Sequence, residues 1–446
     1  MPRYLFVTGK LAADSLADIL EKMAPEFEYE IAVHPITVAA LMDTRFVAKN
    51  LESARGCDIV MIPGLCKGGL EIIADKVGVE VVRGPKTLKD LPRYFGREAH
   101  LEGYGEHKVK ILAEIVDAYE LPLAKILERA EYYRRSGADF IDLGCPVEGR
   151  FPGVVDAVKA LKQHGFKVSL DTFNQEDVLL AGRAGLDMLL SVNGQNLELA
   201  KRLSCKVVVI PDFGQGLDSL ERNIASLEAW NVPYVIDPIL EPISFGFSES
   251  LNRYYEVRSR YPQAEMMMGL GNLTELTDAD TTGISAVMAG VITELEIDYV
   301  LTTEVISWAR GAVRELDIAR KLMYYAWKNH TLPKHLDDGL LTIKDPPYTP
   351  YSEAELRAIQ AKVRDPNFRI FTDRDFIYVF NRDMFIKDTD IQAIFAQLGV
   401  EQASHAFYLG RELYKASLAL QLGKEYMQEQ PLRWGYLSQP AAENAE

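Results

Sequence analysis

The sequence has few cysteines and histidines: its 446 residues contain four Cys and seven His. Cys57, Cys66, Cys145 and Cys205 lie far apart, without a CxxC pair or a matching histidine spacing. This pattern favours reduced thiols over disulfide bonds or a structural zinc site. The histidines are scattered as well, and no local Ser-His-Asp or Cys-His signature of nucleophilic catalysis is present. These kinds of chemistry are therefore disfavoured.

Long apolar runs and basic runs are missing too. No stretch approaches the roughly 20 consecutive apolar residues that a membrane-spanning helix needs. The segment MPRYLFVTGK enters a strand-like run directly, without the basic region and apolar core of a secretory signal. The formal net charge of -16 disfavours a nucleic-acid partner, because it would repel a phosphate backbone. We therefore expect a cytoplasmic protein with neither a membrane nor a nucleic acid as partner.

The composition is otherwise that of an ordinary globular protein, with 48% hydrophobic and 26% charged residues. Residues 1–105 alternate four short apolar runs (YLFVTG, YEIAVHP, DIVMIPG and VEVVRG) with helix-like segments, which predicts a small open parallel α/β domain. Residues 329–446 open with the Pro-rich connection KDPPYTPYSEAEL. A helix, a β pair (FRIFTD and FIYVFNRDMFI) and two further helices follow, which predicts a C-terminal α+β domain.

The middle of the chain, residues 106–328, contains eight strand-like runs, each followed by a helix-like stretch. The runs are KVKILAEI, DFIDLG, KVSLDTF, DMLLSVNG, KVVVIPD, PYVIDP, EMMMGLGN and DYVLTTEV. The helix-like stretches begin near Pro122, Val154, Gln175, Asn196, Leu217, Glu249, Asp280 and Ser307. Eight consecutive βα units predict an α/β fold with a central (β/α)8 TIM barrel. The alternative is a doubly wound open sheet, which would ordinarily break its order at a switch point.

Polar residues gather at the ends of these apolar strands, where a barrel would present them to one shared mouth. They are Glu114, Asp142, Asp171, Ser191, Asn193, Asp212, Asp237, Asn272, Thr302 and Glu304. A buried strand that ends in a carboxylate or an amide needs a hydrogen-bond partner or a ligand there. Helix capping is the structural alternative, and we expect it for Asn174 and Asp280.

Asp171 and Asp237 differ from capping residues, because each lies inside or at the end of an apolar run (VSLDT and VIDP). We expect both carboxylates to contact a ligand. In the fourth strand the alternation of side chains allows either Ser191 or Asn193 to face inward.

The motifs at these strand ends resemble those of a known enzyme family. GADFIDLG, followed by the loop GRFPG, then VSLDT, SVNG and VIDP, resembles dihydropteroate synthase. The layout is most similar to the synthase-related proteins of archaea and methylotrophic bacteria that are associated with tetrahydromethanopterin biosynthesis. The resemblance covers roughly residues 108–328, and its motifs are more specific as an ordered set than singly.

The resemblance implies a pterin ligand. A pterin presents an amino-pyrimidinone edge whose adjacent N–H donors pair well with a buried carboxylate. On the family's pattern Asp171 and Asp237 would hold this edge, and Ser191 or Asn193 would match the fourth-strand asparagine. Asn272 resembles the seventh-strand asparagine of corrinoid-linked, pterin-dependent methyltransferases.

The sequence departs from the synthase pattern at two anion anchors. The seventh strand reads Gly269-Leu270-Gly271-Asn272 where the synthase carries a Ser-Arg-Lys end, and the eighth offers Thr302-Thr303-Glu304 in place of an Arg and a His. A synthase reaction must stabilise the charge that builds on a leaving diphosphate. By resemblance this role would fall to Arg150, Gly269, Gly271 and Thr302, with Mg2+ held by carboxylates such as Glu114. No catalytic residue is assigned.

Three functional hypotheses follow. The first is a transferase that condenses a 6-hydroxymethyl-dihydropterin diphosphate with an aromatic amine in folate-type or tetrahydromethanopterin-type cofactor biosynthesis. The second is a methyltransferase-like barrel that handles the one-carbon group of a reduced pterin, with a corrinoid partner. The third is a non-catalytic pterin carrier. The resemblance also implies a homodimer.

Overall fold

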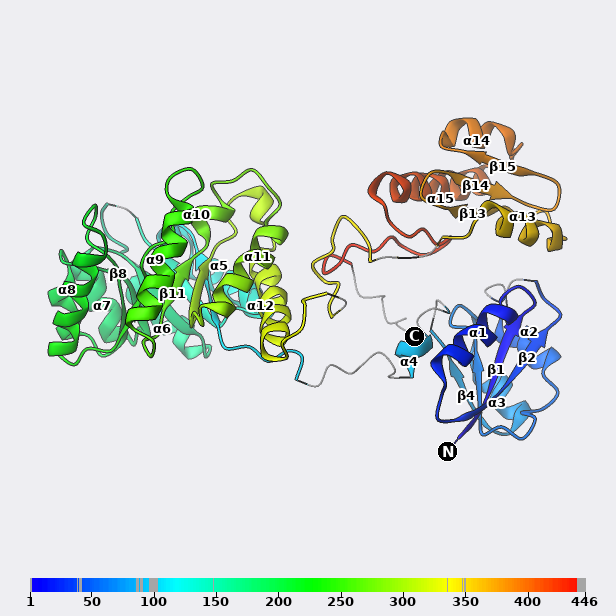
Figure 1. The fold of residues 1–446 in the computed structure, drawn as a ribbon, viewed down its shortest axis with the longest axis horizontal. Helices are drawn as coiled ribbons and strands as arrows, with labels where there is room; N and C mark the ends of the chain where they lie inside the picture. The colour runs from blue at the N-terminus through cyan, green and yellow to red at the C-terminus, as the bar shows by residue number, and fades with distance from the viewer. Residues whose placement is uncertain are drawn as a thin grey trace. The chain divides into compact units, whose positions relative to one another are not determined.

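The computed structural model describes residues 2–37, 39, 42–85, 88, 91–95, 103–146, 148–334, 336–346, 348 and 350–438. The chain divides into two compact units: Met1–Glu102 with Ile343–Trp434, and Gly103–Thr342 with Gly435–Glu446. Within the described residues there are sheets of four, eight and three strands (Figure 1). The domain boundaries at residues 105/106 and 328/329 stay a prediction.

The four-stranded sheet near the N-terminus is parallel, as predicted. Its strands, β1 (Arg3–Gly9), β2 (Glu28–His34), β3 (Ile59–Ile62) and β4 (Glu80–Arg83), lie in the order β2-β1-β3-β4. Between and after them come α1 (Ala13–Met23), α2 (Thr44–Asn50), α3 (Glu71–Val77) and α4 (Leu91–Tyr94). Leu5, Val60 and Ile62 are among its buried core residues. Apolar strands with helical connections thus form the expected open α/β layer.

The C-terminal region contains a three-stranded antiparallel sheet, so the predicted β pair was wrong. Its elements are α13 (Glu353–Lys362), β13 (Arg369–Thr372), β14 (Ile377–Phe380), β15 (Phe385–Asp388), α14 (Ile391–Gln397) and α15 (Ala403–Leu422). The run FIYVFNRDMFI makes two strands because Asn381 Oδ1 accepts hydrogen bonds from the backbone N–H groups of Asp383 (2.9 Å) and Met384 (3.0 Å). This Asn turn reverses the chain inside what reads as one apolar run.

The eight-stranded sheet is the predicted barrel. Its strands are β5 (Lys110–Ile115), β6 (Phe140–Gly144), β7 (Lys167–Asp171), β8 (Met188–Val192), β9 (Lys206–Val209), β10 (Tyr234–Ile236), β11 (Met267–Gly269) and β12 (Tyr299–Thr302). All neighbours are parallel, in the order β10-β9-β8-β7-β6-β5-β12-β11. A parallel bridge between Ile236 and Met266 joins the two ends of this row. The sheet therefore closes, and the open-sheet alternative is excluded.

Helices follow the barrel strands, with one correction. The helices are α5 (Leu123–Arg135), α6 (Val154–Gln163), α7 (Gln175–Ala184), α8 (Gly216–Ala229), α9 (Phe247–Arg260), α10 (Gly271–Thr274), α11 (Thr281–Glu294) and α12 (Ala312–Lys328). Short 3-10 helices lie at η3 (Ala118–Glu120), η4 (Leu197–Arg202) and η5 (Ser307–Ala309). The connection expected as an α-helix near Asn196 is thus η4, a 3-10 helix of six residues.

The two predicted helix caps have different outcomes. Asn174 caps α7, with its side chain accepting from the N–H groups of Glu176 and Asp177. Asp280 precedes α11 but makes no side-chain capping bond, so that part of the prediction was wrong. The β7–α7 turn therefore has the usual Asn cap, whereas α11 begins without one.

Two cores flank the barrel strands. Ile111, Val168 and Val207 belong to the core between the sheet and its helices. Leu112, Phe140, Met188, Leu190, Val208, Val235, Met267 and Tyr299 form a second core. Because successive side chains of a strand alternate between the two faces, the second set fills the barrel interior. The inward row of each strand can then be followed to the mouth, for example from Leu112 to Glu114.

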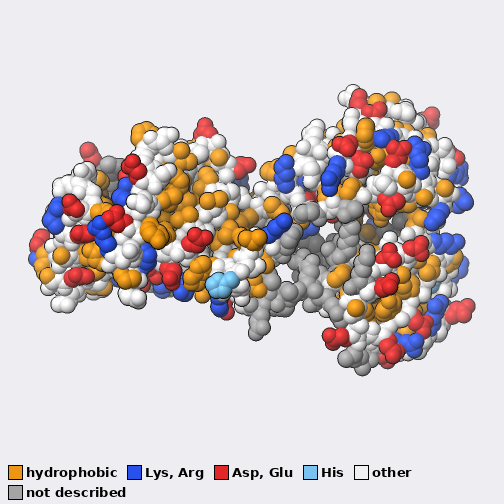
Figure 2. Space-filling model, in the orientation of Figure 1, with side chains coloured by type: hydrophobic (Ala, Val, Ile, Leu, Met, Phe, Trp, Pro, Cys, Tyr) orange, Lys and Arg blue, Asp and Glu red, His pale blue; other side chains and the backbone are white. Residues whose placement is uncertain are grey.

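The surface carries charges of both signs. On the face of the barrel shown in Figure 2, Lys and Arg side chains lie among Asp and Glu side chains. Pairs such as Lys125–Glu128 and Arg134–Glu131 have both partners more than a third exposed. Each such pair stabilises a fold by only about 0 to 1 kcal/mol, so the buried cores dominate stability. In the part of the chain that the structure describes, every helix is too short or too polar to cross a membrane.

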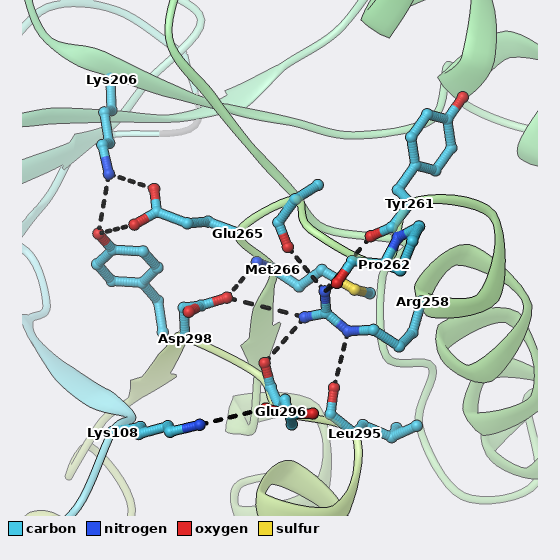
Figure 3. Close-up of polar contacts among 12 residues, drawn as sticks. Lys108, Lys206, Arg258, Tyr261, Pro262, Glu265, Met266, Leu295, Glu296 and Asp298 are labelled. Atoms are coloured by element: carbon cyan, nitrogen blue, oxygen red, sulfur yellow. Dashed lines mark hydrogen bonds and ion pairs between the residues drawn. The ribbon is translucent and has the colours of Figure 1, made fainter.

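The N-terminal ends of the barrel strands, here called the barrel floor, hold paired charges. Asp139, Asp187 and Asp298 each precede a strand and accept a backbone N–H from the neighbouring segment, at Ile111 (2.9 Å), Val168 (2.8 Å) and Met266 (2.9 Å) respectively. Figure 3 shows the part of this floor around Asp298. Each carboxylate thus ties two strands together.

Arg258 of α9 connects several segments of this floor (Figure 3). It donates to the carbonyls of Leu295 (2.9 Å) and Glu296 (2.8 Å). It also donates to the carbonyl of Ala264 (2.8 Å) and lies 3.8 Å from Asp298. These bonds link α9 to the segments that precede β11 and β12.

Candidate functional site

Carboxylates occupy the inward row at the C-terminal ends of the barrel strands, here called the mouth. Glu114 of β5 lies opposite Asp142 of β6, and Asp142 lies opposite Ser169 of β7. Ser169 donates a 2.6 Å hydrogen bond to Asp142 Oδ1, whereas the buried Oδ2 has no hydrogen-bond partner in the described structure. A Cβ at Gly144 would lie 2.9 Å from Glu114 Oε1, so glycine at this position leaves room for that carboxylate.

These carboxylates raise one another's pKa. Burial raises the pKa of Glu114 to about 7, helped by the negative charges of Asp171 and Glu275. Burial also raises the pKa of Asp142 well above its usual range, with Glu114 and Asp171 adding to the effect. The pKa of Asp171 is raised by burial and lowered in part by the neighbouring Ser191 side chain. The cluster therefore holds protons under conditions in which exposed carboxyls are ionised.

Asp237 lies on the other side of Asp171 and has its own partners. Tyr254 donates its hydroxyl to Asp237 Oδ1 over 2.6 Å, and the N–H of Ile239 donates to the same oxygen over 2.8 Å. Burial raises the pKa of Asp237 to about 6, opposed by the Tyr254 bond. These bonds fix the carboxyl group through Oδ1 and leave Oδ2 available to a ligand.

A bulge at the end of β8 determines on which face of the sheet the side chains of this strand lie. The register shifts between Leu189 and Val192, and Ser191 adopts a left-handed conformation with φ of 58°. The shift places Val192 in the core behind the sheet, although Leu190 belongs to the interior core. Ser191 and Asn193 then both lie on the mouth side. Asn193 Oδ1 accepts from the N–H of Gln195 (3.0 Å), while its buried Nδ2 has no partner in the described structure.

The seventh and eighth strands add an amide and two further polar groups. Asn272 donates from Nδ2 to the carbonyl of Leu240 over 2.6 Å, so its amide is held by the loop after β10. Thr303 is buried beside Glu275. Burial raises the pKa of Glu275, and a hydrogen bond from the Thr303 side chain opposes this rise. These groups extend the polar lining from Glu114 around to Asn272.

The residues expected to hold a diphosphate lie in three different settings. Arg150 is partly exposed and forms ion pairs with Glu176 (2.9 Å) and Asp177 (3.6 Å) of α7. Gly269 ends β11 with open space where a Cβ would stand, and Gly271 opens α10 beside Glu275 and Thr303. Thr302 is buried in the row of β12 that shares a face with Val300, which packs against the helices. Gly269, Gly271 and Thr302 thus lie near one another at the ends of the adjacent strands β11 and β12, whereas Arg150 is bound to α7.

Two other polar strand ends are bound by the protein itself. Asp212 accepts from the N–H of Gly194 (2.7 Å) and from Asn223 Nδ2 (3.0 Å). Glu304 accepts from the Tyr132 hydroxyl (3.0 Å) and the N–H of Val313 (3.2 Å). Both carboxylates therefore have structural partners.

The eight loops that follow the barrel strands are rich in acidic residues. Outside the 3-10 helix η4, which contains Lys201 and Arg202, the Lys or Arg residues of these loops are Arg150 and Arg310, and Arg310 is exposed. The acidic residues of the same loops are Asp117, Glu120, Glu148, Asp212, Asp237, Glu241, Glu275, Asp278, Asp280 and Glu304. The mouth therefore has a strongly negative electrostatic environment.

The expected Mg2+ site finds no support in the arrangement. Among the described residues, no group of three or more His, Cys, Asp or Glu side chains could hold a metal ion. The Glu114 carboxylate faces Asp142, whose Oδ1 is already bonded to Ser169. The residues present do not fit a metal ion, and no step of the function proposed below passes through one.

Two mouth residues, Glu275 and Thr303, were not among the predicted site residues. Glu275 follows the seventh strand by six residues, so only folding brings it to Gly271 and Thr303. Thr303 could have been found from parity, because Tyr299 and Leu301 share its face of β12 and pack in the barrel interior. The alternation of β12 therefore favours Thr303 over Thr302 as an inward residue.

Solved structures similar to this chain are dihydropteroate synthases. The enzyme of Vibrio fischeri ES114 is 16% identical and has a TM-score of 0.39, over 50% of this chain and 94% of that chain. The enzyme of Xanthomonas albilineans, solved in complex with 7,8-dihydropteroate, is 17% identical with a TM-score of 0.38, over 50% and 92% of the two chains.

Two family models match the flanking regions. Residues 3–86 match a family of unknown function, DUF6513, and residues 388–429 match PterinBD-DUF4346. The uncharacterized protein MJ0107 of Methanocaldococcus jannaschii is 28% identical over 522 residues, covering 96% of this chain and 98% of that protein. The likeness to this relative therefore extends over all three regions of the chain.

Proposed function

We propose that the barrel is a pterin-binding transferase related to dihydropteroate synthases. The observation that carries the proposal is a pair of buried polar atoms in the mouth that the described protein leaves without partners: Asn193 Nδ2 and Asp142 Oδ2. An unpaired buried polar group destabilises the protein by about 1 to 3 kcal/mol. A ligand that pairs with such a group therefore gains binding free energy of that order. Asp171 and Asp237 flank this pair.

The pairing suits a pterin ring. Its amino-pyrimidinone edge presents two adjacent N–H donors, which the Asp171 and Asp237 carboxyl groups would accept. Asn193 Nδ2 would donate to a ring oxygen or nitrogen. Tyr254 fixes Asp237 and the β8 bulge fixes Asn193, so these groups are oriented before a ligand arrives.

The first candidate reaction is the condensation of a 6-hydroxymethyl-dihydropterin diphosphate with an aromatic amine, in biosynthesis of a folate-type or tetrahydromethanopterin-type cofactor. Arg150, Gly269, Gly271 and Thr302 are the residues proposed to meet the diphosphate. Arg150 would have to leave Glu176 and Asp177, with which it is paired, to do so.

The second candidate is the transfer of a one-carbon group on a reduced pterin. A specific observation favours it: the mouth is lined by carboxyl groups and by the Asn272 amide rather than by cations. A reaction without an anionic leaving group needs no cationic anchor there. Both candidates use the same site for the pterin ring.

A calorimetric titration of the whole chain with 6-hydroxymethyl-7,8-dihydropterin tests the pterin site. The matched control ligand is its 2-desamino analogue, which lacks one donor of the ring edge. We expect the pterin to bind and the analogue to lose about 1 to 3 kcal/mol, the cost of leaving a buried carboxyl group unpaired. Equal affinity for the two, or no binding of either, would overturn the proposal. Release of diphosphate on adding an arylamine to the pterin diphosphate would select the first reaction.

A further inference from the structure

The mouth contains four carboxyl side chains in one cluster, of which one is fully buried, Asp142, and three are half-buried, Glu114, Asp171 and Glu275. Glu114 lies directly opposite Asp142 across the β5–β6 ladder. The charged neighbours that raise the pKa of Glu114 are Asp171, Glu275 and Asp117, all of them acidic. The cluster therefore meets no compensating cation among the groups that act on Glu114.

The nearest arginines are engaged elsewhere. Arg253 of α9 donates to the carbonyls of Pro238 (3.3 Å) and Ile239 (2.8 Å), beneath the loop after β10. Arg150 is paired with two carboxylates of α7. The carboxyl cluster thus has no built-in counter-ion on the described side chains around it, in contrast to the carboxylates of the floor.

A structural role does not account for the cluster. Ser169 satisfies one oxygen of Asp142, but the buried Oδ2 has no partner in the described structure, and neither has the buried Asn193 Nδ2 on the mouth side of β8. Carboxylates kept only for stability are paired or hydrogen-bonded, because an unpaired buried charge is costly. These two buried polar atoms without partners instead indicate a ligand in the mouth.

We propose that the side of the mouth formed by Glu114, Asp142 and Glu275 takes a group that is uncharged or positively charged, and that Glu114 and Glu275 make the site select against anionic pterins. The inference rests on the pterin site proposed above and deepens it, because it names the charge class of the substrate. A reduced pterin with an amine or a cationic one-carbon group at this position fits. A pterin diphosphate brings its negative charges against the carboxylates.

The test is a comparison of three pterins on the whole chain at about pH 8.5, above the pKa of about 7 of Glu114, so that this carboxyl group is ionised. They are 6-hydroxymethyl-7,8-dihydropterin, which is neutral, its diphosphate, which is anionic, and its 6-aminomethyl analogue, which is cationic. We expect the cation to bind at least about tenfold more tightly than the anion, since like charges a few ångströms apart in a buried site repel by more than 1.4 kcal/mol. The neutral pterin should lie between them.

Glu114→Gln and Glu275→Gln should each narrow the ratio of cation to anion affinity, by about tenfold in the double variant. Asp278→Asn is the matched control, because Asp278 lies in the same loop as Glu275 and is exposed. It changes the net charge by the same amount and should leave the ratio unchanged.

Tighter binding of the diphosphate than of the amine would overturn this inference and leave the pterin site in place. The same holds for a ratio that Asp278→Asn shifts as much as Glu275→Gln does, since the effect would then come from net charge. Failure of all three pterins to bind would overturn the proposed function, and this inference with it.

Discussion

The floor and the mouth of the barrel use the same residue type in opposite ways. At the floor, Asp139, Asp187 and Asp298 each accept a backbone N–H from a neighbouring strand segment. At the mouth, the buried Asp142 keeps one oxygen without a partner. The comparison teaches that an aspartate before a strand serves closure of the sheet, whereas an aspartate within or at the end of a strand is available for chemistry.

Lys and Arg side chains also differ between the floor and the mouth. The floor holds Arg258 on backbone carbonyls, Lys162 on Asp187 and Lys206 on Glu265. Outside η4, the loops of the mouth contain two arginines among many acidic residues. Such a division is typical of a TIM barrel, in which one end stabilises and the other binds.

Arg258→Ala would break the floor and should have the largest effect on stability. The side chain is 18% exposed and donates to several carbonyls that would lose their partner. We expect a loss of about 3 to 5 kcal/mol in the free energy of unfolding, measured by chemical denaturation. Arg260→Ala is the control: Arg260 is 43% exposed and pairs only with Glu221 and Glu256 among its described contacts. Equal losses of unfolding free energy in the two variants would show that the bonds of Arg258 at the floor stabilise the fold no more than exposed ion pairs do.

Glu114→Gln tests the carboxyl groups of the mouth through the pH dependence of the unfolding free energy. The pKa of Glu114 is raised from 4.5 to about 7, so the folded state binds the proton more tightly than the unfolded state. This contribution to stability is complete below pH 4.5 and is lost as the pH rises to about 7, by about 3 kcal/mol at most. Denaturation of wild type and variant from pH 4 to 8 should show the wild type losing more stability over this window. Parallel curves would mean that Glu114 titrates normally.

Asp171→Asn and Asp237→Asn test the mouth as a binding site. Each replaces an acceptor of the pterin edge by an amide that can present one oxygen only. We expect pterin affinity to fall by about 1 to 3 kcal/mol in calorimetry. Stability above pH 7 should not fall, because the variant no longer buries an ionised carboxylate. Glu148→Gln, an exposed acid of the loop after β6, serves as control. Unchanged affinity in both variants would remove the site assignment.

Arg150→Ala should have the smallest effect. The Arg150 side chain is 46% exposed, and its ion pair with the exposed Glu176 is worth about 1 kcal/mol or less. Its contact with the buried Asp177 is long, at 3.6 Å, and Asp177 also accepts the backbone N–H of Phe151. We expect little change in unfolding free energy and an unchanged affinity for the neutral pterin. A large, selective loss of affinity for the diphosphate would instead assign Arg150 to the leaving group.

The sequence allowed the barrel to be predicted because its eight strands are continuous apolar runs with polar ends. Such runs can be recognised in the sequence without knowing which distant residues they contact in the fold. The C-terminal sheet was predicted with one strand too few because the Asn381 turn interrupts a run that reads as a single strand. The α-helix expected near Asn196 is instead the 3-10 helix η4, a difference that the apolar pattern of the sequence does not reveal.

The mouth could be predicted only in part. Asp171 and Asp237 stood out because a carboxylate inside an apolar strand is costly without a partner. The choice between Ser191 and Asn193 could not be made from alternation, because the bulge in β8 changes the parity of the strand within the motif itself. Glu275 was out of reach, since its place beside Thr303 depends on how α10 turns back over the strand ends.

The closure of the barrel through the single bridge between Ile236 and Met266 has a consequence for its motions. β10 and β11 are three residues long, so this joint is held by fewer backbone bonds than the others. Amide protons along it should exchange with solvent through local opening before those of β6 and β7. Asp237 follows Ile236 directly, so a ligand on this carboxylate would hold the joint shut. A ligand bound in the mouth would then slow amide hydrogen exchange along the joint between β10 and β11.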